Sequence, residues 1–196
     1  MNTDLYEQFV TLKDSGKKAD AKEVLDLFIA SFQTPEGIRD WVFRFLESGD
    51  YGHRIRHEIY EKLVYPVLLN GYLENDVCSI EWLAKTFSNL VCLKSRHKLL
   101  EDKCPFTLYR EAFTLGPNKE NKAYVLNQLI RWFQFAEHEW PDYLIWGTDD
   151  TIEEYEDLLN EVDFARSLDD QNEHEYFLFQ FEAKVNEYIR RLQEHT

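Results

Sequence analysis

The chain has 196 residues, of which 44% are hydrophobic and 15% aromatic, enough to build a sizeable core in a single domain. Its formal net charge is −15 at pH 7, and the excess lies in the last third of the chain. Nucleic acid and anionic membrane surfaces are poor partners for that part, because binding them requires cationic side chains. No apolar run is long enough to cross a membrane, and the acidic, amphipathic start MNTDLYEQFV does not resemble a signal peptide, so we expect a cytoplasmic protein.

Nearly every segment has apolar residues at helical spacing, and the segments are separated by turn-forming residues. The third segment shows the pattern well: Thr34 can cap its N-terminus, Pro35 suits the first helical position, and apolar residues follow every three or four positions. Pro66 should kink or divide the fourth helix. In chain order, we predict helices over 3–15, 19–33, 35–48, 53–73, 76–94, 106–115, 119–139, 150–168 and 172–194.

The short turns between these helices, and the lack of strand-like alternation, predict an all-α fold. We expect about nine helices arranged as stacked antiparallel α-hairpins, in a solenoid-like or irregular bundle. With no long linker, residues 1–196 should form one compact domain.

One stretch resembles a known repeat family. Residues 109–130, YREAFTLGPNKENKAYVLNQLI, are similar to the junction between two tetratricopeptide repeats, with Ala112, Leu115, Pro117 and Asn118 matching the helix end and turn. Residues 16–29 are similar to the start of such a helical hairpin, but no 34-residue period runs through the chain. The resemblance implies stacked α-hairpins, and such folds mostly bind other proteins.

The negative charge is concentrated near the end of the chain. Residues 1–136 are near neutral, with 19 acidic and 18 basic residues. Residues 137–196 hold 18 acidic residues and only four basic ones, a net −14. This strongly acidic C-terminal part of the domain could accept a basic protein partner.

The histidines offer a candidate metal site. His53 and His57 have the i, i+4 spacing that can chelate zinc, but Arg54 and Arg56 beside them oppose a cation. Two Glu-His-Glu triplets, at 137–139 and 173–175, cannot each converge on one ion, because adjacent helical residues point about 100° apart. We therefore expect no metal or other cofactor.

The three cysteines do not form a disulfide framework. Cys78 and Cys92 are expected on one helix about four turns apart, too far to bond. Cys92 lies in an apolar run and is expected to be a buried, inert thiol.

An aromatic-rich stretch, residues 131–147, directly precedes an acidic helix. Glu153, Asp157 and Glu161 form a like-charge stripe at i, i+4 and i+8, opposite the apolar face. Four aromatic residues exceed the needs of a simple amphipathic helix and are either core residues or partly exposed: Phe135, Trp140, Tyr143 and Trp146. Of these, Trp140, Tyr143 and Trp146 are the candidate anchors for a partner.

We therefore expect a non-enzymatic binding protein with no catalytic residues. Carboxylates would steer a basic protein partner, and Trp140, Tyr143 or Trp146 would supply the apolar contact. Bacterial immunity proteins, which neutralise cationic toxins, are similar in charge and size. The alternative is a metal-dependent helical hydrolase that uses His53 and His57 with carboxylates from elsewhere.

Overall fold

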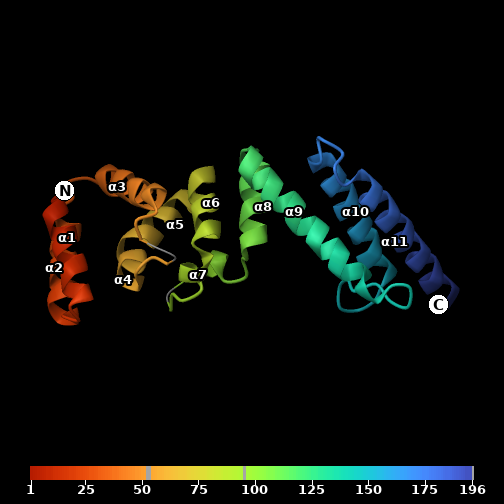
Figure 1. Cartoon of the computed structure of the whole chain (residues 1–196), viewed down its shortest axis with the longest axis horizontal. Helices are drawn as coiled ribbons and strands as arrows, with labels where there is room; N and C mark the ends of the chain where they lie inside the picture. Colours follow the sequence, from red (N-terminus) through yellow and green to blue (C-terminus); the bar gives the residue numbers. More distant parts are fainter. Residues whose placement is uncertain (52–53, 95, 196) are drawn as a thin grey trace. The chain divides into compact units, whose positions relative to one another are not determined.

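A computed structural model describes residues 1–51, 54–94 and 96–195, and all regular secondary structure in these ranges is helical (Figure 1). The predicted all-α class is confirmed. The chain divides into two compact units, Met1–Leu108 and Tyr109–Thr196, each with its own internal contacts. That the whole chain folds as one domain stays a prediction.

Unit 1 contains a run of short and medium helices. The elements that begin in it are α1 (Thr3–Asp14), α2 (Lys18–Ala30), α3 (Pro35–Ser48), α4 (His57–Ile59), the π-helical turn η1 (Tyr60–Val64), α5 (Tyr65–Leu73), α6 (Val77–Lys85), α7 (Phe87–Leu90), the 3₁₀ turn η2 (Lys98–Leu100) and α8 (Pro105–Leu115). The helices α4, η1 and α5 follow one another without a break, so the described elements agree with the predicted number of about nine helices.

Consecutive helices in unit 1 pack as hairpins, with α1 against α2 and α5 against α6. Their ends follow the predicted chemistry. Thr34 accepts a hydrogen bond from the Gly37 amide (3.1 Å) at the start of α3, and Gly49 ends this helix in the left-handed conformation (φ +68°). The predicted irregularity at Pro66 also occurs, as the π-helical turn that precedes α5.

The helix predicted over 76–94 is wrong, because the structure breaks it between α6 and α7. At the break, the Thr86 hydroxyl donates to the Trp82 carbonyl oxygen (2.6 Å) and lies 3.1 Å from the Tyr60 hydroxyl. The Tyr60 side chain is fully buried and comes from a distant part of the chain. A tertiary contact therefore accompanies a helix end that the local periodicity does not reveal.

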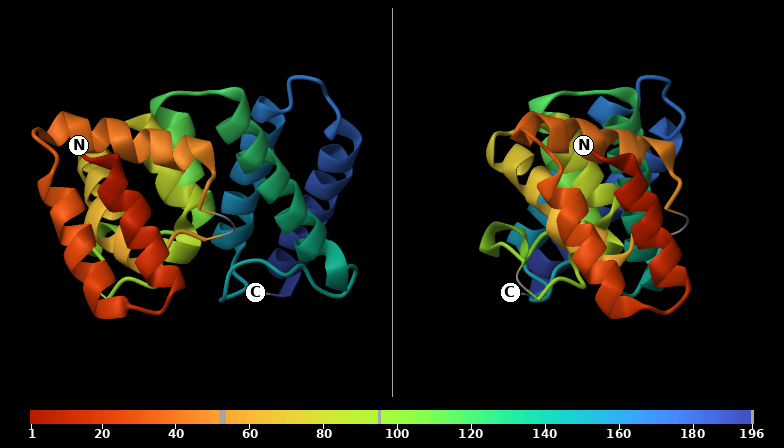
Figure 2. Two further views of the ribbon diagram at one scale, coloured as in Figure 1. Left: turned by 60° about the vertical axis from the view of Figure 1, so that its left-hand side comes forward. Right: turned by 90° about the vertical axis from the view of Figure 1, so that its left-hand side faces the viewer.

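Unit 2 contains three long helices after the end of α8. They are α9 (Lys119–Ala136), followed by the 3₁₀ turn η3 (Glu137–Glu139), then α10 (Ile152–Leu168) and α11 (Glu175–His195). The helix α10 packs against both α9 and α11 (Figure 2). The centre of this bundle is aromatic and aliphatic, and its fully buried side chains include Phe133, Tyr155, Val162, Phe181 and Val185.

The predicted turn and cap of unit 2 are also present. Gly116, Pro117 and Asn118 connect α8 to α9, and Asn118 caps α9 by accepting from the Asn121 amide (2.9 Å). At the start of α10, Thr151 and Glu154 form the predicted reciprocal capping box.

The boundary between the units lies at residues 108 and 109, not at 136 and 137, where the charge of the sequence changes. Counted by unit, Tyr109–Thr196 holds 20 acidic and eight basic residues, a net −12, and Met1–Leu108 has a net −3. The excess negative charge therefore belongs to the three-helix unit. Within the described residues, no helix is both long and apolar enough to cross a membrane.

Candidate protein-binding surface

The segment between η3 and α10 carries the predicted aromatic anchors, and backbone contacts tie it to the bundle. The Ile145 amide donates to the Ala136 carbonyl oxygen (2.9 Å) at the end of α9. The buried Tyr155 hydroxyl lies 2.8 Å from the carbonyl oxygen of Leu144, whose side chain is also buried. The anchors are thus presented from a packed segment.

All three predicted anchors are half-buried. They are therefore neither fully buried core residues nor fully exposed side chains, the two possibilities that the sequence left open. The Arg191 guanidinium lies over the Trp140 ring, 4.7 Å from its centroid, and donates to the Pro141 carbonyl oxygen (2.5 Å). Tyr143 meets Tyr188 edge-on with a centroid distance of 5.9 Å. The Trp146 ring packs against the Phe133 ring with a centroid distance of 6.2 Å. Each ring therefore packs on one side while part of its surface stays accessible.

Asp150 connects this segment to α10 and α11 through hydrogen bonds. Its backbone is left-handed (φ +54°), and its carboxylate accepts from the Tyr155 hydroxyl (2.7 Å) and the Tyr188 hydroxyl (3.4 Å). Burial, reinforced by the neighbouring Asp150 charge, raises the pKa of Tyr155, and the same two causes raise the pKa of Tyr188 to about 12. Both phenols therefore remain protonated donors at neutral pH.

Raising the pH from 10 to 12 is expected to destabilise unit 2. A group whose pKa is raised by folding contributes stability that is present below its unfolded value, about 10 for tyrosine, and is lost as the pH passes through its folded value. For Tyr188 this window runs from pH 10 to about 12. In the variant Tyr188→Phe, the urea midpoint should fall less steeply with pH across this window than in the unaltered chain. The difference in slope corresponds to one proton, because the variant lacks the Tyr188 hydroxyl, whose proton the unfolded chain would release. Tyr176→Phe, which alters an exposed ring, is the control, and an equal change in both variants would contradict the assignment.

Glu154 organises the turn before α10. Its carboxylate accepts from the amides of Thr148 (2.8 Å), Asp149 (3.2 Å) and Thr151 (3.3 Å). These backbone donors, Thr148 first, hold the pKa of Glu154 below its usual range. Gly147 has a φ of +59°, and a Cβ there would lie 2.2 Å from the Glu154 carboxylate. Glycine at this position therefore lets the turn close around the charge.

The acidic stripe of α10 divides into paired and unpaired members. Glu161 accepts two hydrogen bonds from the Arg110 guanidinium (2.7 and 2.8 Å), which also lies over the Phe164 ring at 4.5 Å. The charge of Glu161 is therefore compensated within unit 2. Glu153 and Asp157 are exposed, and neither forms an ion pair in the described part of the chain.

Glu156 lies on the same outer face of α10, although it was not predicted from the sequence as a site residue. It is exposed, and like its neighbours it has no ion-pair partner in the ranges that the structure covers. Its spacing of three residues from Glu153 is the signal that could have identified it, because i and i+3 positions share a helix face. Glu153, Glu156 and Asp157 together are called the α10 acidic face below.

The most exposed aromatic side chains of unit 2 are not the predicted anchors. Phe135 on α9 is 63% exposed, and on α11 Tyr176 is 74% and Phe179 is 64% exposed. Neither Tyr176 nor Phe179 was predicted from the sequence to be a binding residue. Their positions in the sequence could have indicated exposure, because they lie three residues apart and outside the apolar stripe that contains Phe181 and Val185.

The histidine site cannot be assembled from the described residues. His53 lies outside them, and His57 is exposed, with its Nε2 atom 3.6 Å from Glu61 Oε2. In the first triplet, Glu137 pairs with Lys184 (2.6 Å) and His138 with Glu139 (3.2 Å). Across the described ranges, no group of three or more His, Cys, Asp or Glu side chains could hold a metal ion.

The cysteine predictions need two corrections. Cys78 lies in α6, but Cys92 follows α7, so the break at Thr86 separates them and they do not share a helix. Cys92 is exposed rather than buried, and the Arg54 guanidinium lies 2.7 Å from its sulfur. All three cysteines are free thiols.

Comparisons with protein-family models, curated proteins and solved structures give no match to this chain.

Proposed function

We propose that this protein is a non-enzymatic binding module that uses its acidic unit 2 to bind a basic protein. The observation that carries the proposal is the α10 acidic face, where three exposed carboxylates lie together without ion-pair partners in the described residues. Neighbouring acids differ, since Glu161 pairs with Arg110 and Asp163 pairs with Arg166 (2.7 Å).

Like charges at adjacent turns oppose folding, by about 0.2–0.5 kcal/mol for each pair. A basic partner would relieve this repulsion on binding. It would also be drawn to the surface at long range, because the net −12 of unit 2 creates a negative field that extends beyond any single contact. Electrostatic steering of this kind raises association rates more than it raises final affinity.

The half-buried aromatic segment would supply the apolar part of the contact. Trp140, Tyr143 and Trp146 are held by packed neighbours, so little side-chain entropy would be lost when a partner covers their remaining surface. Neutralisation of a cationic toxin, as in bacterial immunity proteins, is one specific role that uses this chemistry. Its support here is the chain's size and charge.

The test is capture of partners from a lysate of the source organism at low and at high salt. Basic proteins should bind the unaltered chain at low salt and dissociate at high salt, because salt screens exposed charges. The triple variant Glu153→Gln, Glu156→Gln, Asp157→Asn should slow association with a captured partner by about tenfold or more at low salt.

A matched control removes three exposed acids from unit 1, with Asp20→Asn, Glu23→Gln and Glu47→Gln. It makes the same change in net charge and should leave association nearly unchanged. If both triple variants slow association equally, total charge rather than the α10 acidic face governs binding. If no basic protein is captured, the proposal is wrong and the acidic residues serve solubility.

A further inference from the structure

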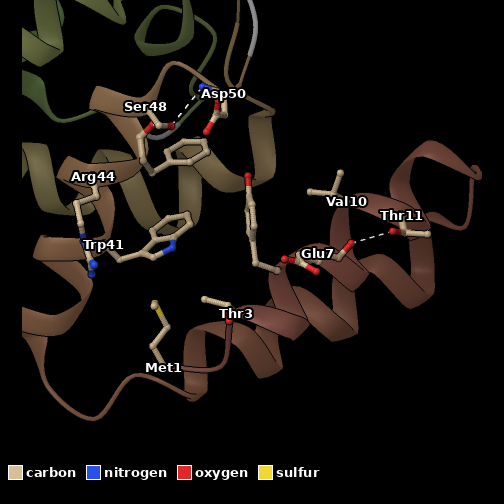
Figure 3. A pocket seen from close by; sticks show the side chains of 11 residues that line it. Met1, Thr3, Glu7, Val10, Thr11, Trp41, Arg44, Ser48 and Asp50 are labelled. Atoms are coloured by element: carbon tan, nitrogen blue, oxygen red, sulfur yellow. Dashed lines mark hydrogen bonds between the residues drawn. The ribbon is translucent and has the colours of Figure 1, made fainter.

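A cleft of about 630 Å³ opens between α1 and α3 in unit 1, and none of the residues that line it is used in the proposed function (Figure 3). Its aromatic wall comes from both helices. Trp41 and Phe45, one turn apart on α3, are stacked at 5.0 Å with an angle of 10° between their planes. Tyr6 of α1 meets both rings edge-on, at 5.3 and 6.0 Å. A volume of this size is typical of small-molecule sites.

Two polar groups in this wall have no hydrogen-bond partner among the described residues: the Trp41 indole N–H and the Tyr6 hydroxyl. Only 8% of the Trp41 side chain is exposed, and a tryptophan so deeply buried usually finds an acceptor for its N–H. No fully enclosed side-chain N or O atom in the described chain lacks a partner, so the indole N–H must reach open space. Figure 3 shows its nitrogen turned towards the cleft.

The Tyr6 hydroxyl is a second donor at the cleft. Burial raises its pKa, and the Asp50 charge adds to the increase, while Arg56 opposes it. Tyr6 is therefore neutral under ordinary conditions and able to donate. Together with Trp41, it offers two unused donors to an acceptor group on a bound molecule.

The charged side chains that line the cleft are the carboxylates of Glu7 and Asp50 and the guanidinium of Arg44. Glu7 and Asp50 both line it, and neither forms an ion pair in the part of the chain that the structure describes. Asp50 is positioned by the end of α3, where Gly49 is left-handed and the Asp50 amide donates to Ser48 Oγ (3.2 Å). Arg44 is engaged with the Asp40 carbonyl oxygen (3.1 Å) and extends away from Glu7 in Figure 3.

We infer that this cleft binds a small organic ammonium compound that has an aromatic or apolar body. The body would contact the rings of Tyr6, Trp41 and Phe45. The ammonium group would lie near the carboxylates of Glu7 and Asp50. An acceptor atom on the ligand would accept a hydrogen bond from the indole N–H of Trp41. The site is independent of the α10 acidic face, so either assignment can fail without the other.

The experiment uses three probes that share a 4-hydroxyphenyl body, whose phenol oxygen can accept a hydrogen bond, and differ in the end group: tyramine, 4-(2-hydroxyethyl)phenol and 3-(4-hydroxyphenyl)propanoate. Each is titrated into the ¹⁵N-labelled full chain at constant ionic strength, and the indole N–H resonances are followed by NMR. The chain has five tryptophans, and Trp41→Phe identifies the Trp41 resonance while keeping an aromatic wall.

Tyramine should shift the Trp41 resonance saturably and bind about threefold to tenfold more tightly than 4-(2-hydroxyethyl)phenol, as expected for a charge-assisted contact at an accessible site. The propanoate should bind most weakly, because its charge is repelled. Equal binding of all three probes, stronger binding of the propanoate, or no saturable shift of Trp41 would overturn the proposal.

Single charge variants test the two carboxylates. Glu7→Gln and Asp50→Asn should each weaken tyramine binding by about threefold to tenfold and leave 4-(2-hydroxyethyl)phenol binding unchanged. Glu23→Gln on α2 is the matched control, because it removes an exposed acid that does not line the cleft. If the control weakens binding as much as the two variants do, general charge explains the effect and the assigned site is wrong.

Discussion

Gly71→Ala is expected to destabilise unit 1 by about 3 kcal/mol, a large effect for the addition of one methyl group. Gly71 is buried on α5, where that helix packs against α6. A Cβ at this position would lie 2.0 Å from Ser79 Oγ and 2.5 Å from Ser79 Cβ. Rotating the Ser79 hydroxyl would relieve only the first contact, because the Ser79 Cβ is fixed by the helix backbone. The two helices would have to move apart.

Gly37→Ala is the control, since it adds the same methyl group to another helical glycine of unit 1. Its Cβ would lie 3.5 Å from Thr34 Oγ1 and 4.0 Å from Phe32, which is ordinary contact. Because alanine favours helices, this variant should be neutral or stabilised by up to about 1 kcal/mol. Urea denaturation followed by circular dichroism compares the two. Similar midpoints for both variants would show that α5 and α6 do not pack as closely as described.

Phe181→Ala is expected to lower the free energy of unfolding of unit 2 by about 3–5 kcal/mol. The Phe181 side chain is fully buried and stacks on Phe133 at 4.9 Å, which joins α11 to α9 through their side chains. Removing the ring leaves a cavity in the core. The lost stability therefore includes the transfer free energy of the removed atoms and the free-energy cost of the cavity.

Phe179→Ala provides the matched control two residues earlier on the same helix. Because Phe179 is 64% exposed, its removal should change the free energy of unfolding by less than about 0.5 kcal/mol. Denaturant midpoints measured on both variants test the orientation of α11 directly. If the Phe179 variant is the more destabilised, α11 is rotated so that Phe179 rather than Phe181 faces the core.

The sequence predicted the helices well where their ends depend on local groups. Thr34 and Thr151 bond to amides three residues later, so the information needed to start α3 and α10 is contained within one turn. The π-helical irregularity near Pro66 has a similarly local cause, since proline lacks the amide that a regular helix requires. The break at Thr86 differs, because its hydroxyl lies against Tyr60, which is 26 residues away.

The candidate surface shows the same division. Charge and periodicity were enough to place Glu153 and Asp157 on the outer side of a helix, and the structure has both exposed. Periodicity could not show that Glu161 is neutralised by Arg110, since the partner lies 51 residues earlier in the chain. The burial of Trp140 likewise depends on Arg191 from the end of α11.

The sequence by itself therefore determined the helical class, most helix limits and the concentration of acid in the last third of the chain. These properties follow from residue type and from neighbours within about four positions, which is the range of a helical hydrogen bond. The tertiary structure decided which acids stay unpaired, how deeply the aromatic anchors are buried, and that Tyr6 and Trp41 meet in one wall of a cleft. Each of these depends on side chains brought together by packing between helices, and that packing is not encoded in the period of any single one.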